Sequence, residues 1–82
     1  MKERLAQKIQ DEMVNALIKR RKELGLSHEK LAGLAGVHRT AISHIENRRR
    51  NPTVLICLKL AYALDCDFSK IMKTAEIQSM KR

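Results

Sequence analysis

The segment from Gly25 to Pro52 constrains the fold more than any other part of the chain, because its glycines and its proline divide it into short helices. Gly25 is able to adopt the left-handed conformation that ends a helix, and Ser27 is a good N-cap for the next one. Gly36 supplies the positive φ that a tight turn between helices requires. Pro52 cannot continue a helix, so the preceding helix must end before it. The spacing predicts helices over 28–35 and 39–47.

The rest of the chain also favours helices. Aromatic residues make up 2% of the 82 residues, so the core must come from aliphatic side chains, which suit helix packing better than a sheet. Residues 2–24 repeat apolar side chains at the spacing of an amphipathic helix. Thr53 caps a fourth helix, and Asp67 or Ser69 caps a short fifth one. We therefore predict an all-α, five-helix domain that ends in a weakly helical or frayed tail, residues 74–82.

The apolar positions predict the core. In the first helix Leu5, Ile9 and Leu24 belong to an inward-facing series. The fourth helix, which includes Leu55, is apolar almost all round and is predicted to be the central core helix. Residues 1–12 exceed what a core-facing helix of a small domain needs, so we interpret them as an N-terminal helical extension. Because Leu5 and Ile9 need burial, this extension is expected to cap the core or to pair with another subunit rather than to fray.

The charge of the chain indicates a polyanionic partner. The formal net charge is +8 and the sequence pI is about 10.0, an excess most often associated with nucleic acid. The charge is concentrated in two basic runs, residues 19–22 and 48–50. Charge alone would also fit a generally basic surface, so the position of the second run, directly after the helix predicted over 39–47, carries more weight.

The helix over 39–47 has one apolar and one polar face. Ile42 and Ile45 are predicted to face the core. The polar stripe consists of Arg39, Thr40, Ser43, His44 and Asn47. The guanidinium fork of Arg39 fits the O6/N7 edge of guanine, so Arg39 is the best candidate for base readout. A cationic helix held by a partner helix is typical of proteins that enter the DNA major groove, the alternative being a solvated polar face.

Other classes of function find little support in the sequence. No apolar run is long enough to span a membrane and no signal-peptide pattern is present, so a cytoplasmic location is expected. Cys57 and Cys66 lack the spacing of a disulfide framework and are expected to be reduced thiols. His38 and His44 do not share a helix face, so no metal site is predicted. No nucleophile elbow, phosphate loop or paired carboxylate indicates an enzyme or a cofactor.

Several motifs at fixed offsets together resemble the helix-turn-helix domain of phage-repressor and Cro-like regulators, also called the XRE family. They are Gly25-Leu26-Ser27, Leu31-Ala32, Gly36-Val37, Ile42-Ser43, Ile45-Glu46, Asn51-Pro52 and the run from Leu60 to Leu64. Within the family the chain is most similar to the controller proteins of restriction–modification systems and to small phage-type repressors. The resemblance implies a lambda-repressor-like DNA-binding domain over residues 13–73, with its helix-turn-helix at about 27–47.

The resemblance also implies roles for individual residues. The predicted DNA contacts are His28, His38, Arg39, Thr40, Ser43, His44, Asn47, Arg48, Arg49 and Arg50. His28 replaces a Gln that often contacts a phosphate in the family, and Arg48 takes a position usually held by Gly. A left-handed arginine there costs about 1 kcal/mol, so the loop is expected to differ in shape or to gain a phosphate contact. Arg21 and Glu46 match a family ion pair, which we interpret as structural.

The expected partners are double-stranded DNA and a second copy of the chain. A monomer of this size reads only a few base pairs, so two-fold symmetry and a palindromic operator are expected. The candidate interface residues, for which a core position is an equally good alternative, are Phe68, Ile71, Met72 and Ile77. Two alternatives stay open: an antitoxin that uses the N-terminal helix to bind a toxin, and a non-specific nucleic-acid binder or co-activator. Contact with RNA polymerase is a further open possibility.

Overall fold

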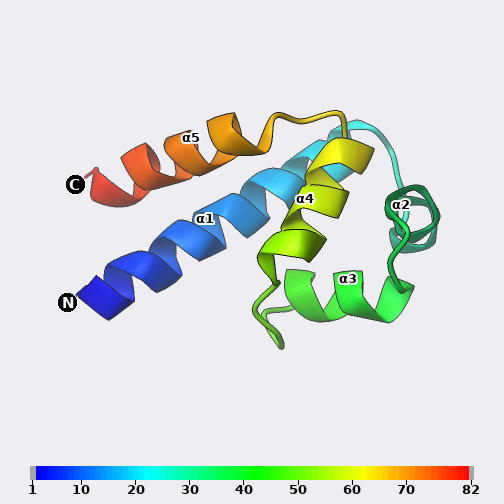
Figure 1. Cartoon of the computed structure of the whole chain (residues 1–82), viewed down its shortest axis with the longest axis horizontal. Helices are drawn as coiled ribbons and strands as arrows, with labels where there is room; N and C mark the ends of the chain where they lie inside the picture. The colour runs from blue at the N-terminus through cyan, green and yellow to red at the C-terminus, as the bar shows by residue number, and fades with distance from the viewer. Residues whose placement is uncertain (1, 82) are drawn as a thin grey trace.

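The computed structural model describes the backbone of residues 2–81 and the side chains of residues 3–81. Within this range the fold consists of five α-helices, as predicted (Figure 1). They are α1 (Lys2–Glu23), α2 (His28–Ala35), α3 (Arg39–Glu46), α4 (Val54–Ala63) and α5 (Phe68–Met80). None of the helices in the described range is both long enough and apolar enough to cross a membrane.

The helix boundaries follow from the local signals in the sequence. Gly25 and Gly36 adopt φ angles of 68° and 69° and form the left-handed turns predicted for them. The Ser27 hydroxyl accepts a hydrogen bond from the Lys30 amide at 3.0 Å, capping α2. Thr53 caps α4 in the same way, and Asp67 caps α5. These boundaries are local effects, so they could be predicted without knowledge of the tertiary structure.

The core lies where α1 crosses the helix-turn-helix and α4. Buried side chains come from all five helices: Met13, Val14, Leu17, Leu31, Ala32, Ile42, Ile45, Cys57, Leu60, Ala61, Leu64 and Ala75. Helix α5 runs along α1, whereas α2 and α3 pack together on the other side of α4 (Figure 1). Helix α1 is therefore shared by both halves of the molecule.

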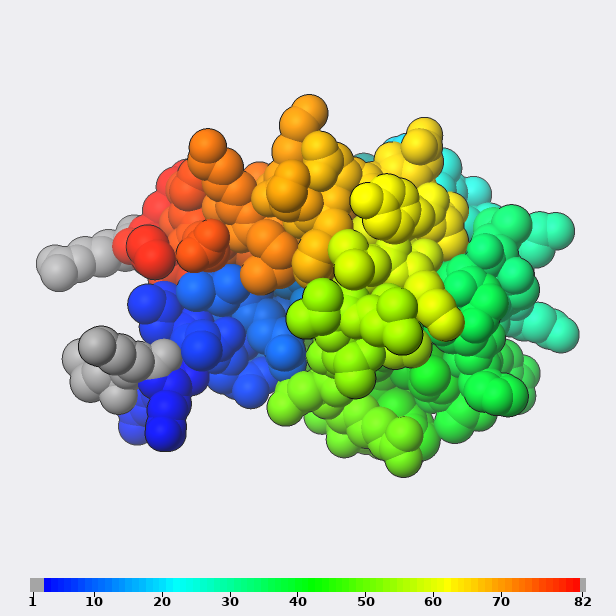
Figure 2. Space-filling model, viewed as in Figure 1, coloured from blue at the N-terminus to red at the C-terminus, as the bar shows by residue number. Residues whose placement is uncertain are grey.

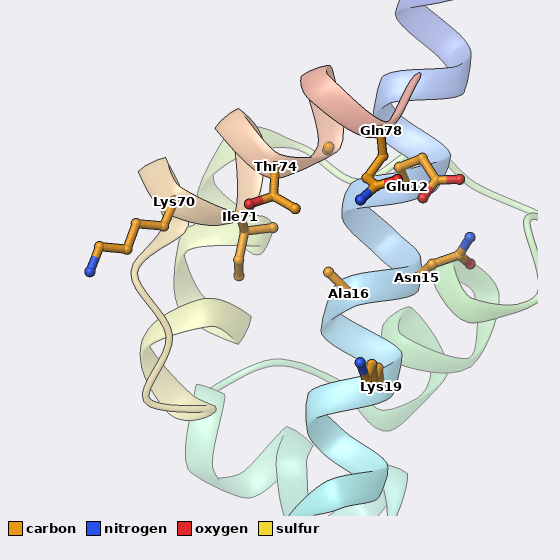
Figure 3. Close-up of a pocket in the computed structure, with 9 residues that line it drawn as sticks. Glu12, Asn15, Ala16, Lys19, Lys70, Ile71, Thr74 and Gln78 are labelled. Carbon is orange, nitrogen blue, oxygen red and sulfur yellow. The ribbon is translucent and has the colours of Figure 1, made fainter. Parts of the chain in front are cut away.

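The C-terminal tail differs from the prediction. Residues 74–80 continue α5 as a regular helix instead of fraying. The reason is tertiary, because Ala75 and Ser79 are buried and α5 packs along α1 (Figure 2). A shallow groove remains between the two helices, and Ala16 and Ile71 approach each other across it (Figure 3). The long first helix thus supplies the surface that stabilises the last one.

Two predicted core positions are wrong. Leu24 is 43% exposed, because it follows the last residue of α1 and lies at the turn formed by Gly25. Leu55 is 60% exposed, because α4 is covered on one face only. Leu60 and Ala61 lie on the covered face, and Leu64 follows them as the buried C-cap. The all-round apolar pattern of α4 therefore predicts its inner face correctly but does not make the whole helix central.

Candidate nucleic-acid interface

The turn between α2 and α3 fixes the position of the third helix. The amides of Gly36 and Val37 both donate to the carbonyl oxygen of Ala32, at 2.9 and 3.1 Å. Ile42 and Ile45 then anchor α3 in the core, with 1% and 5% of their surfaces exposed. This seating leaves the opposite face of α3 turned outward.

The outward face carries the polar stripe predicted from the sequence. Arg39 and Thr40 are exposed, Ser43 and His44 are half-buried, and Asn47 is exposed at the C-cap. The Asn47 amide donates to the Ser43 hydroxyl at 3.4 Å, which links two members of the stripe. His38 is the exposed N-cap residue of α3, but its side chain makes no capping hydrogen bond. The N-terminus of α2 and the outward face of α3 enclose an open hollow lined by Ser27, His28, Glu29, Arg39, Thr40 and Ser43.

A carboxylate at the end of α3 ties three helices together. Glu46 accepts hydrogen bonds from Nε and Nη2 of Arg21, at 2.7 and 2.8 Å. The same carboxylate lies 2.9 Å from Nε2 of His28. Arg21 also donates from Nη1 to the carbonyl oxygen of Leu26 at 2.8 Å. The structure thus brings the predicted pair of Arg21 and Glu46 into bidentate contact and adds His28 as a third member.

The electrostatics of Glu46 reflect this environment. Burial on its own raises the pKa of the Glu46 carboxyl, because a charge is costly to remove from water. Hydrogen bonds and charge from Arg21 and His28 outweigh that effect, so the pKa lies below its ordinary value of 4.5. The carboxylate is therefore ionised at neutral pH, and its contacts fix the positions of α1, α2 and α3 relative to one another.

The three arginines after α3 are all exposed, Arg48 with 37% of its side-chain surface, but they differ in their contacts. Arg49 and Arg50 are exposed, and their backbone amides both donate to the carbonyl oxygen of His44, at 2.8 and 3.3 Å. No ion pair in the described part of the chain involves either side chain. Arg48, in contrast, adopts a φ of 60°, which is left-handed, and directs its guanidinium towards Asp11 and Asn15 of α1.

Sequence reasoning missed the α1 side of this contact. It assigned no contact to Asp11 or Asn15, and none to Gln10, whose amide donates to Oδ1 of Asn51 at 2.7 Å. The available signal was the arginine at a position usually held by glycine. Arg48 at that position indicated an altered loop, but nothing in the sequence spacing identified Asp11 and Asn15 as its partners.

The candidate interface residues fall into two environments. Phe68, Ile71 and Met72 are partly buried and pack against the core. Ile77 is 51% exposed. Three large apolar side chains on the outer face of α4 are also exposed: Val54, Leu55 and Tyr62, at 69%, 60% and 73%.

Comparison with known proteins places this geometry in a family. The profile of the helix-turn-helix family matches residues 17–71, which include the whole of α2, α3 and α4. The chain belongs to the helix-turn-helix family. Its α2–turn–α3 unit is thus a DNA-binding element of the type found in transcriptional regulators, in agreement with the resemblance inferred from the sequence.

One curated relative of this helix-turn-helix protein adds detail. The control protein C.SmaI of Serratia marcescens is 40% identical over 47 residues. The aligned region covers 57% of this chain and 56% of the relative, so the chain spans little more than half the length of that protein. The name of the relative agrees with the similarity to controller proteins noted in the sequence.

Proposed function

We propose that this protein is a sequence-specific regulator of transcription that binds a palindromic operator as a homodimer, with α3 in the major groove. The observation that carries the proposal is the polar stripe on the outward face of α3, followed by two exposed arginines. A helix seated by two buried isoleucines and held at its end by Glu46 presents that stripe at a fixed angle. Such preorganisation is what groove recognition requires.

The proposed contacts divide by chemistry. Arg39 and Thr40 lie in the first turn of α3, the part of a recognition helix that meets base edges, with Ser43 and His44 one turn later. Phosphates are assigned to the residues around the helix ends: His28, His38, Asn47, Arg49 and Arg50. His28 reaches Glu46 through Nε2, so its phosphate contact would use the other ring nitrogen.

The outer face of α4 supports the homodimer. Val54, Leu55 and Tyr62, with the half-buried Leu58 between them, place exposed apolar side chains on one face of α4, and such clusters are typical of protein interfaces. Val54 also borders a hollow lined by Phe68 and Met72, two of the predicted interface residues. A second copy of the same surface would fill this hollow and bury the exposed side chains, as an isologous two-fold interface does.

The antitoxin alternative loses its main argument. It depended on an N-terminal helix without a role of its own. Helix α1 is continuous from Lys2 to Glu23, and α5 packs along it. The extension is therefore accounted for within the chain, and no observation favours a toxin over DNA.

The deciding experiment is a selection of binding sites from randomised duplex DNA at near-physiological salt, with Arg39→Ala in parallel. We expect an enriched palindrome with half-sites about 10 base pairs apart for the wild type. The variant should lose about 1–3 kcal/mol on that site and become tolerant at one base position. If no sequence is enriched while binding is tight and salt-sensitive, the protein is a non-specific nucleic-acid binder and the operator model fails.

A further inference from the structure

We propose that the middle of α1 clamps the loop that follows the recognition helix, and that Arg48 is a positioning residue rather than a phosphate contact. The inference rests on the proposed function, because the loop is the segment assigned to the DNA backbone. The clamp consists of Gln10, Asp11 and Asn15 from α1 and Arg48 and Asn51 from the loop.

The contacts of Arg48 use all parts of its guanidinium. Nη2 donates to Oδ1 of Asn15 and to the carbonyl oxygen of Asp11, the latter at 3.4 Å. Nε lies 3.8 Å from the Asp11 carboxylate, and Nη1 donates to the carbonyl oxygen of Ile45 at 3.4 Å. A move towards a phosphate would break these contacts. The Asp11 carboxylate also offsets part of the charge that Arg48 would otherwise offer to DNA.

The side chain of Asn15 is directed towards this contact. Asn15 lies at the edge of the groove between α1 and α5, and Figure 3 shows its amide directed away from Lys70 and Ile71 of α5. The amide oxygen is therefore able to accept the hydrogen bond from Arg48. The second contact, from Gln10 to Asn51, lies more than one helical turn closer to the N-terminus of α1. Both contacts come from residues 10–15 in the middle of α1, where the N-terminal extension joins the core-facing part of the helix.

The two clamped loop residues, Arg48 and Asn51, lie on either side of the arginines proposed to contact phosphates. Arg48 and Asn51 bracket Arg49 and Arg50, whose exposed side chains make no ion pair within the described part of the chain. Fixing the residue before and the residue after this pair fixes the backbone from which both arginines project. Their own hydrogen bonds to His44 hold only the amides. Arg48 also occupies a left-handed conformation that is unfavourable for arginine, and its contacts with α1 add to the local backbone hydrogen bonds that maintain it.

Asn15→Ala is the sharpest test, because it removes one partner of Arg48 without changing the net charge. Alanine is also the better helix former, so α1 itself is not weakened. We expect binding to the selected operator to weaken by about three- to tenfold, since the loop arginines must then be ordered on binding. The slope of log Kd against log salt should stay unchanged, because no phosphate contact is lost.

Arg48→Ala and Arg49→Ala form a matched pair, one inside and one outside the clamp. Arg48→Ala should resemble Asn15→Ala, and the double variant should be little weaker than either single variant. Arg49→Ala should instead reduce the salt slope by about one. If Arg48→Ala reduces the salt slope as Arg49→Ala does, or if Asn15→Ala leaves binding unchanged, Arg48 is a phosphate contact and the proposal is overturned.

Amide hydrogen exchange in the free protein separates this proposal from the function on which it rests. With Asn15→Ala, exchange at the amides of residues 48–51 should rise about threefold or more, while the amides of α4 stay as in the wild type. If the wild type enriches no operator, the proposed function fails, and this measurement alone decides whether the clamp exists. Unchanged exchange in the loop would refute it whether or not DNA binds.

Discussion

The contact between Arg21 and Glu46 is predicted to be the most important polar interaction for stability. The side chains are 12% and 14% exposed, so water does little to solvate either group. Replacing Arg21 with Met keeps the apolar stem but leaves the Glu46 carboxylate with His28 as its remaining partner. Stranding a fully buried charge costs about 3–5 kcal/mol, and this carboxylate retains some exposure and one partner. We therefore expect Arg21→Met to lower the free energy of unfolding by about 2–4 kcal/mol.

Chemical and thermal denaturation measure this loss directly. For a domain of this size, 1 kcal/mol corresponds to about 4–8 °C in Tm, so the expected decrease is roughly 10–30 °C. The double variant Arg21→Met/Glu46→Leu strands neither charge and should be less destabilised than the sum of its single variants. A loss below about 0.5 kcal/mol for Arg21→Met, or strict additivity in the cycle, would refute the reasoning, because both results are typical of a solvent-screened pair.

Three further predictions follow from the same structure. Because the pKa of Glu46 is lower in the folded state than its ordinary value of 4.5, its ionisation stabilises the fold above that pH, and the contribution is lost as the pH falls below it. Urea denaturation from about pH 6 to pH 3 should therefore show a steeper loss for the wild type than for Glu46→Gln, and parallel curves would contradict this assignment. Leu55→Glu should convert the proposed dimer into a monomer in sedimentation experiments, whereas Leu34→Glu, at a similarly exposed site on α2, should not. Equal behaviour of the two variants would exclude the outer face of α4 as the dimer interface. Arg50→Ala should weaken binding to cognate and random duplexes alike and reduce the salt slope by about one, and a loss confined to the cognate sequence would indicate base contact instead.

The parts of the fold that could be predicted from the sequence are those with local causes. Gly25, Gly36, Ser27 and Thr53 act on the backbone within a few residues of themselves, so their positions defined the helix ends. The spacing of Ile42 and Ile45 likewise predicted which face of α3 is turned outward. The polar stripe of the candidate site followed from that orientation alone.

The parts that could not be predicted depend on distant segments. Whether the outer face of α4 is covered depends on how the other helices are placed, and its apolar sequence looks the same in either case. The helical tail depends on α1, which packs along it. The orientation of Arg48 depends on Asp11 and Asn15, which lie 37 and 33 residues away in the chain. A single sequence contains no signal for such a pairing.

Helix α1 makes contacts with both parts of the proposed DNA-binding segment, the recognition helix and the basic loop. Arg21, near the C-terminal end of α1, holds Glu46 at the end of α3, and the middle of the same helix holds Arg48 and Asn51. With 22 residues, α1 is about 33 Å long, enough to reach both places. A rigid helix that fixes the recognition helix and the basic loop together lowers the ordering cost of binding, because neither has to be arranged when DNA arrives. This gives residues 10–15 of α1 a task besides packing, and it implies that a truncation of α1 that removes Gln10 and Asp11 would weaken DNA binding before it unfolds the domain.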